Sequence, residues 1–140
     1  MLVRDVMSTE IVTVARDATL HEAVGELLEH GVGSVVVLDG GHPAGIVTEM
    51  DALEAVHEAG APLTTVGLDQ FCEGAILTTE PDRTVQSVAR RMADEGVKKF
   101  PVMDDLEIVG IVTMTDIVYH LSDLRAEAQR LVERHYDWSE

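Results

Sequence analysis

The sequence predicts an α/β (α+β) fold built from two similar halves, each with the element order β-α-β-β-α. Three observations support this prediction: the chain repeats itself at one offset, short β-branched runs alternate with segments of helical period, and glycines and capping residues separate them. One such half cannot bury its own apolar strands and helices. We therefore expect the two halves to pack together with pseudo-two-fold symmetry.

The repeat is clearest in one motif, Gly-Ile-Val-Thr-x-x-Asp. It occurs at residues 45–51 and again at residues 110–116, so the offset between the copies is 65 residues. The same offset, without a gap, relates further positions in the two halves, among them Ile11, Thr13, Asp17, Thr19, Gly31, Val32, Val37 and Asp39. Two copies in 140 residues indicate a duplicated unit rather than a long solenoid.

The first half predicts a short helix or turn and then five elements. We expect the helix or turn at 2–8, then a strand, a helix, two strands around a turn and a helix, at residues 11–14, 19–31, 35–38, 43–47 and 48–57. Thr19 and Glu22 have the spacing of a capping box, and Gly31 suits the left-handed position that ends a helix.

The second half predicts the same order again. The expected strand, helix, two strands and helix lie at residues 76–79, 84–96, 100–103, 108–112 and 113–121, and residues 122–135 suit a charged amphipathic helix. The resulting organisation is a first repeat, a linker, a second repeat and a helical tail, at residues 1–60, 61–73, 74–121 and 122–140.

The composition of the chain is strongly acidic. A formal net charge of −16 arises from 26 acidic and 10 basic side chains, and the only two lysines are adjacent, Lys98 and Lys99. Such a charge repels a phosphate backbone, which disfavours nucleic-acid binding. A surface this acidic and poor in lysine is also typical of a protein solvated in high salt, which suggests a halophilic host.

Several functional classes lack their sequence signatures. No apolar run is long enough to span a membrane, the N-terminus does not resemble a signal peptide, and Cys72 has no partner for an internal disulfide, so we expect a cytoplasmic protein. The histidines have no zinc-ligand spacing, and neither a nucleophile motif nor a Walker loop occurs. We expect no metal site, no required cofactor and no catalytic residues.

The ordered set of a short strand, a helix ending in Gly-Val, a hairpin and Gly-Ile-Val-Thr-x-x-Asp resembles the CBS domain (cystathionine-β-synthase-type domain). Two copies in tandem resemble a CBS pair, or Bateman module, over residues 3–121. The remaining chain is too short for a fused enzyme, so the protein resembles a free-standing pair.

The resemblance implies ligand clefts between the two repeats. In this family an Asp carboxylate accepts the ribose hydroxyls of an adenine nucleotide or related adenosyl compound, and the Thr hydroxyl assists. One predicted cleft combines Ile46, Thr48 and Asp51 with Ile76, Leu77 and Thr78. The other combines Ile111, Thr113 and Asp116 with Ile11, Val12 and Thr13.

The two predicted clefts differ in charge. At the place where the family often carries groups for the ligand phosphates, the first repeat has Gly33 and Ser34 and the second has Lys98 and Lys99. We predict that the Thr113/Asp116 cleft takes the charged ligand, AMP, ADP or ATP. The Thr48/Asp51 cleft is then empty or takes an uncharged adenosine-like ligand.

Plainer interpretations of the same residues stay open. Thr-x-x-Asp before an apolar run is also a helix capping box, a role compatible with ligand contact because a helix N-terminus favours anions. Lys98 and Lys99 can equally be solvated surface residues, and adjacent residues on a strand point to opposite faces, so at most one is expected to face a cleft.

The sequence therefore predicts a non-catalytic regulatory module that binds an adenosyl ligand and signals through its conformation to a partner protein. By resemblance, two pairs associate through their helices, so we predict a homodimer, with residues 122–138 as a further source of contact. The alternatives are a sensor of S-adenosylmethionine and a structural interaction module that binds no ligand.

Overall fold

The computed structural model describes residues 1–72, 76–121, 130, 132 and 133. The chain divides into two compact units. One is Val12–Ile76, called the first-repeat unit below; the other combines Met1–Ile11 with Leu77–Ser139 and is called the second-repeat unit. The predicted helix at 122–135 lies outside the described residues apart from 130, 132 and 133.

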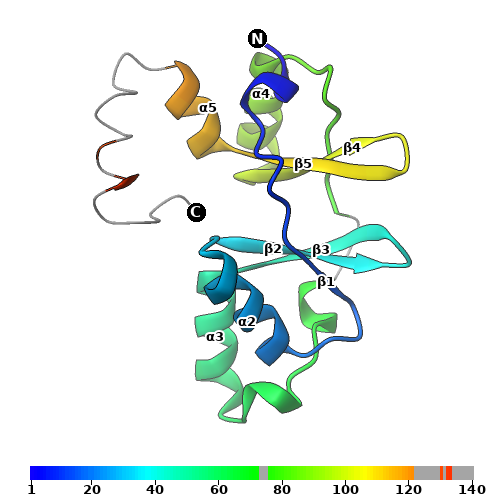
Figure 1. Cartoon of the computed structure of the whole chain (residues 1–140), viewed down its shortest axis with the longest axis vertical. Coiled ribbons are helices and arrows are strands. Elements are labelled where there is room, and N and C mark those ends of the chain that lie inside the picture. The colour runs from blue at the N-terminus through cyan, green and yellow to red at the C-terminus, as the bar shows by residue number, and fades with distance from the viewer. Residues whose placement is uncertain (73–75, 122–129, 131, 134–140) are drawn as a thin grey trace. The chain divides into compact units, whose positions relative to one another are not determined.

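The first-repeat unit has the expected β-α-β-β-α order. Its elements are β1 (Thr13–Ala15), α2 (Leu20–His30), β2 (Ser34–Asp39), β3 (His42–Thr48) and α3 (Glu49–Ala59), followed by the short 3-10 turns η1 (Leu63–Thr65) and η2 (Asp69–Phe71). The sheet order is β1-β2-β3, with β1 parallel to β2 and β2 antiparallel to β3. Helices α2 and α3 contact each other and cover one face of this sheet (Figure 1).

The second-repeat unit is built from α1 (Val3–Val6), α4 (Val85–Glu95), β4 (Lys99–Asp104), β5 (Glu107–Thr113) and α5 (Met114–Leu121). Its sheet has two strands, β4 and β5, paired antiparallel in the same register as β2 and β3. Helices α4 and α5 contact each other, as α2 and α3 do. The α+β class and the mixed order of helices and strands are therefore confirmed.

The strand predicted at residues 76–79 is wrong in extent, because only Thr79 forms an isolated parallel bridge, to Val102. Prolines explain the loss. In the first repeat, Val36 N–H donates to the Val12 carbonyl at 3.0 Å and Arg16 N–H donates to the Leu38 carbonyl at 2.8 Å. The equivalent donors, 65 residues on, are Pro101 and Pro81, which have no N–H to give.

The helix ends form where the sequence predicts them. Thr19 and Glu22 make a reciprocal capping box on α2, and the Thr84 hydroxyl accepts from the Ser87 N–H at the start of α4. Gly31 and Gly96 end these helices at φ 61° and φ 68°, in the left-handed region that glycine adopts without strain.

The segment that precedes each repeat packs in the unit of the other repeat. We call these two segments, at residues 1–11 and around residue 68, the exchanged segments. Val3 and Val6 are buried with Phe100 in the second-repeat core. The equivalent segment near residue 68 is buried in the first-repeat core, where Leu68 is 1% exposed. Matching isolated bridges fasten both segments, Leu2 to Thr84 and Gly67 to Thr19. These contacts show which compact unit each preceding segment joins. The division of the sequence into a first repeat, a linker and a second repeat, at residues 1–60, 61–73 and 74–121, remains a prediction.

The position of the exchanged segments explains why the repeated motif begins with a glycine. A Cβ on Gly45 would collide with the backbone carbonyl of Phe71. A Cβ on Gly110 would lie 2.7 Å from Met7 Sδ and 2.8 Å from the Ser8 carbonyl oxygen. Each exchanged segment therefore crosses its strand so closely that a side chain at the glycine position has no room.

Candidate functional site

The two Thr-x-x-Asp motifs lie at equivalent strand-to-helix junctions and form reciprocal capping boxes. Thr113 N–H donates to Asp116 Oδ2 at 3.0 Å, and Asp116 N–H donates to Thr113 Oγ1 at 3.0 Å. Thr48 and Asp51 repeat this arrangement at 3.0 Å and 3.1 Å. The capping role is thus present in both repeats. Each carboxylate uses Oδ2 for its cap, and a carboxylate has further acceptor positions for a ligand's hydroxyl groups.

Asp116 is distinguished by its surroundings. It is half-buried, and burial raises its pKa from the ordinary value of 3.8, although the hydrogen bonds from Thr113 and the nearby His120 and Lys99 act in the opposite direction. His120 is one helical turn beyond Asp116, with its Nδ1 2.9 Å from the Asp116 carbonyl oxygen. A half-buried carboxylate close to the cationic Lys99 is an electrostatic setting suited to binding a polar ligand.

The two lysines occupy different environments. Lys99 opens β4, its Cα pairs with that of Thr113 across the hairpin, and its Nζ is buried. Lys98 is exposed, and its backbone carbonyl accepts the Met114 N–H at 2.9 Å. In the first repeat, Ser34 holds the position of Lys99, paired with Thr48. Of the two lysines, it is therefore Lys99 whose side chain lies near a Thr/Asp box.

The remaining predicted residues are divided between the two units. Ile46, Val12, Thr13 and Ile76 belong to the first-repeat unit with Thr48 and Asp51, whereas Ile111, Ile11, Leu77 and Thr78 belong to the second-repeat unit with Thr113 and Asp116. Val12 and Leu77 pack against the cores of their units, and the Thr78 carbonyl accepts from Arg91 at 2.7 Å. Each predicted cleft draws on both units, and this combination stays a prediction.

Sequence reasoning missed His120 beside Asp116. The signal was available, because residues four apart on a helix are neighbours on its surface. It also missed Arg16, whose guanidinium pairs with Asp39 at 3.3 Å and with Asp69 at 3.1 Å. These ion pairs connect the end of β1 to the β2–β3 turn and to the exchanged segment around residue 68. All three residues line a cavity of about 570 Å³.

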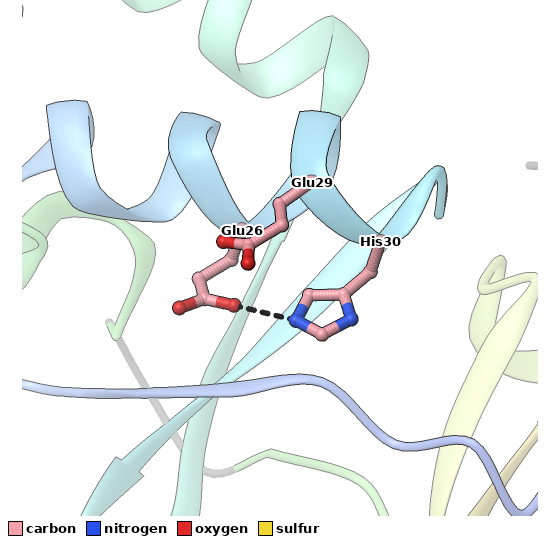
Figure 2. Close-up of side chains that lie close together, drawn as sticks. All are labelled: Glu26, Glu29 and His30. Carbon is pink, nitrogen blue, oxygen red and sulfur yellow. Dashed lines mark ion pairs between the residues drawn. The ribbon is translucent and has the colours of Figure 1, made fainter.

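One group of potential metal ligands lies outside the Thr/Asp boxes. Glu26, Glu29 and His30 gather their ligand atoms within 4.8 Å on the last turns of α2 (Figure 2). The spacing of histidines and cysteines does not reveal this combination, because two of its three members are glutamates. Glu26 and His30 form an ion pair at 3.0 Å, and Glu29 and His30 are exposed. Such a pair at i and i+4 is a common feature of helix surfaces.

Comparison with known proteins identifies the family. The model of the CBS domain matches residues 3–58 and 72–123. The chain belongs to the CBS domain family. It carries two CBS domains in tandem, and such pairs generally regulate rather than catalyse.

Relatives of known sequence and of known structure resemble the chain over most of its length. An uncharacterized protein of Methanopyrus kandleri, MK0525, is 30% identical over 137 residues, which cover 94% of this chain and 70% of the relative. The solved CBS domain pair of protein MJ0100, in complex with 5′-methylthioadenosine and S-adenosyl-L-methionine, is 26% identical with a TM-score of 0.74, covering 93% of this chain and 98% of that one.

A hexameric CBS-CP12 protein from bloom-forming cyanobacteria shares 26% identity at a TM-score of 0.77, covering 94% of this chain and 77% of that one. CBS pairs therefore occur in oligomeric assemblies. Among the described residues of the present chain, no helix combines the length and the apolar character needed to cross a membrane.

Proposed function

We propose that this CBS pair is a ligand-sensing regulatory module that binds adenosyl compounds through its two Thr/Asp boxes. The observation that carries the proposal is the setting of Asp116, a half-buried carboxylate held in place by Thr113 and close to Lys99. Support comes from the related pair of MJ0100, which was solved with two adenosyl compounds bound.

The ligand's ribose is the part that such a carboxylate recognises. Two adjacent hydroxyl groups are donors that match the acceptor oxygens of Asp116 or Asp51, and charge-assisted hydrogen bonds of this kind are strong. The cap fixes the carboxylate before the ligand arrives, because Oδ2 is already bound to the Thr N–H. The entropy of ordering that side chain is therefore not lost again on binding.

The two boxes are proposed to take different ligands. The Thr113/Asp116 box has Lys99 next to it, so it suits a phosphorylated ligand, AMP, ADP or ATP. The Thr48/Asp51 box has Ser34 in place of the lysine and Glu49 beside the threonine, so it suits an uncharged or cationic adenosyl compound. Methylthioadenosine and S-adenosylmethionine, the compounds bound by MJ0100, have that character.

Signalling is proposed to run through the geometry of a homodimer that a partner protein recognises in the cytoplasm. A ligand shifts such an equilibrium only if it binds the two geometries with different affinity. Both Thr/Asp boxes cap a helix of their unit, α3 or α5, so a ligand at either box acts directly on the position and order of a helix start.

The experiment is a thermal-shift titration with S-adenosylmethionine, methylthioadenosine, AMP, ADP and ATP. Wild type is compared with Asp116→Asn and Asp51→Asn, which keep an amide oxygen for the cap but lose the charge. Glu22→Gln is the matched control, because Glu22 caps α2 in the same way outside both proposed sites. A ligand at a hundredfold excess over its Kd adds about 2.7 kcal/mol of stability.

We expect Asp116→Asn to abolish the shift with phosphorylated ligands and Asp51→Asn to abolish the shift with the others, whereas Glu22→Gln leaves both unchanged. Lys99→Ser is expected to raise the Kd of phosphorylated ligands about tenfold. Lys98→Ser measures what the exposed neighbouring lysine contributes to binding. If no adenosyl compound stabilises the wild type, the alternative of an interaction module without a ligand replaces this proposal.

A further inference from the structure

Three potential metal ligands lie together on the last turns of α2. Glu26, Glu29 and His30 each offer one donor atom, and these atoms lie within 4.8 Å of one another (Figure 2). Glu26 Oε2 and His30 Nε2 are 3.0 Å apart, which taken alone is an ordinary surface ion pair. With Glu29 the pair becomes a set of three, and the residues that the structure describes contain no second set of this kind.

The helix itself brings these side chains together. Positions i, i+3 and i+4 lie on one face of an α-helix, so Glu26, Glu29 and His30 share the same side of α2. Gly31 ends the helix directly afterwards in the left-handed conformation. The three backbone positions are therefore held by a regular helix, and only side-chain torsions are left to adjust.

The spacing of the donor atoms fits a first-row divalent metal. Bonds of about 2.1 Å from Zn²⁺ to nitrogen and oxygen, at tetrahedral angles, separate two donor atoms by about 3.4 Å. The Glu26–His30 pair is already close to this separation, and no donor atom has to approach another by more than about 1.4 Å. Glu29 and His30 are exposed, so rotation of their side chains closes the remaining distance.

The charges around the set favour a cation. Neither α2 nor α3, which contacts it, contains a lysine or an arginine that would repel a metal ion. The chain as a whole carries a formal charge of −16. The set also lies at the C-terminal end of α2, which is the negative end of the helix dipole.

The equivalent helix of the second repeat does not offer this set. The residues 65 positions on are Arg91, Asp94 and Glu95, so an arginine replaces Glu26 and the imidazole is absent. Arg91 donates to the Thr78 carbonyl at 2.7 Å, and its guanidinium lies 4.7 Å from the centre of the Phe100 ring. A fixed cation on α4 thus stands where α2 has a carboxylate.

We propose that Glu26, Glu29 and His30 bind a divalent transition metal such as Zn²⁺, with water completing the coordination. An imidazole with two carboxylates suits zinc, whereas Mg²⁺ and Ca²⁺ prefer oxygen ligands alone. The site departs from the sequence-based expectation of no metal. It goes beyond the binding of adenosyl compounds and does not depend on it.

A metal ion at this site restrains the end of α2. The ligand atoms are brought together by the folded helix and not by the unfolded chain, so binding stabilises the first-repeat unit. The segment after α2 leads to Gly33, whose carbonyl accepts the Glu49 N–H at 3.2 Å at the start of α3. The metal therefore acts on a segment that directly precedes the Thr48/Asp51 box in the fold.

The test is a calorimetric titration of the full chain with Zn²⁺, and with Mg²⁺ as the comparison ion. Glu26→Gln, Glu29→Gln and His30→Gln each remove one ligand at an exposed or half-buried position, so we expect folding to persist, as circular dichroism checks. His57→Gln is the matched control. His57 lies in the last turn of α3, with Leu53 in place of a glutamate four residues earlier.

We expect one Zn²⁺ per chain and a Kd at least about tenfold higher in each of the three ligand variants. His57→Gln is expected to bind Zn²⁺ as the wild type does. Zn²⁺ should also raise the melting temperature of the wild type and of His57→Gln more than that of the ligand variants. Without metal, all these proteins should melt at similar temperatures, because an exposed ion pair contributes little.

Several results overturn the site. These are a wild type without saturable Zn²⁺ binding, a Kd for Mg²⁺ as low as that for Zn²⁺, and a His30→Gln variant that binds Zn²⁺ like the wild type. A Glu29→Gln variant with unchanged affinity overturns the set of three, because the ion pair alone is then sufficient. Binding of adenosyl compounds is titrated separately on the same variants and is expected to be unchanged, so the two proposals fail independently.

Discussion

The two repeats of this CBS pair share one element order, yet they differ at a few positions where one repeat has a proline or a charged residue and the other does not. The first repeat has a three-stranded sheet and the second a two-stranded one, because Pro81 and Pro101 replace the N–H donors of Arg16 and Val36. The hairpin and its capped helix keep the same register in both. A duplicated fold therefore tolerates loss of an edge strand but retains the junction that carries the Thr/Asp box.

The chemical difference between the repeats is concentrated at one pair of positions. Ser34 and Lys99 occupy equivalent places opposite Thr48 and Thr113, so the same backbone presents a neutral hydroxyl in one repeat and a cation in the other. Two similar hairpins thus become two different candidate sites through one side chain, without a change in hairpin register. The predictions below test how far this equivalence extends.

The largest expected difference concerns the glycines beneath the exchanged segments. Gly45→Ala places a methyl group against the rigid Phe71 carbonyl and is expected to cost about 3 kcal/mol or more. Gly110→Ala meets the Met7 side chain as well as the Ser8 carbonyl, and because a thioether adapts easily we expect about 2 kcal/mol. Urea unfolding measures both.

The control for these substitutions is Gly25→Ala, inside α2 with no atom within 4 Å of the new Cβ. It is expected to stabilise the protein by about 0.5–1 kcal/mol, as alanine does relative to glycine within a helix. Equal losses for Gly45 and Gly110 would contradict the difference between the two crossings.

The exchanged segments themselves give the next largest effect. Leu68 and Val3 are equivalent and fully buried, at 1% and 0% exposure, in the cores of different units. Leu68→Ala is expected to cost about 3 kcal/mol and Val3→Ala about 2 kcal/mol, because leucine loses one more carbon and leaves a larger cavity. A Val3→Ala variant as stable as wild type would show that residues 1–8 do not support the second-repeat core.

The two capping boxes are expected to be equal in stability. Their hydrogen bonds differ by at most 0.1 Å, so Thr48→Ala and Thr113→Ala should each lower the free energy of unfolding by about 1 kcal/mol. Thermal denaturation without ligand measures the two losses. A clearly smaller loss in one repeat would mean that its threonine serves another purpose than the cap.

The smallest expected effect is a pH dependence of stability that arises from Asp116. Because burial raises its pKa, the folded state holds this proton more tightly than the unfolded chain. The group therefore adds stability in acid, and that contribution is lost as the pH rises through the raised pKa. We expect Asp116→Asn to reduce the fall in unfolding free energy that occurs as the pH rises from the ordinary pKa of 3.8 through the raised pKa. Profiles of the same slope would show that Asp116 does not contribute.

Much of the fold followed from residues that lie close together in the chain. The helix caps at Thr19, Gly31, Thr84 and Gly96 and the two hairpins were predicted in the correct order. The strand expected at residues 76–79 is reduced to one bridge at Thr79, although Pro81 and Pro101 were visible in the sequence. Their effect depends on which carbonyl each position faces across the sheet, and the sequence does not show that pairing.

The candidate site was predicted only in part for the same reason. The Thr/Asp boxes follow from a spacing of three residues, whereas the burial of Lys99 Nζ and its proximity to Asp116 depend on the β4–β5 register. Arg16 likewise joins Asp39 and Asp69, which lie 23 and 53 residues away in the chain.

The sequence by itself determined the duplication, the element order and the ends of the helices, because these depend on local propensities and hydrogen bonds that span a few residues. Only the tertiary structure decided that residues 1–11 join the second-repeat unit, that a carbonyl crosses Gly45, and that Asp116 is half-buried close to Lys99. Burial and close approach depend on segments far apart in the chain, and these meet only when each unit folds.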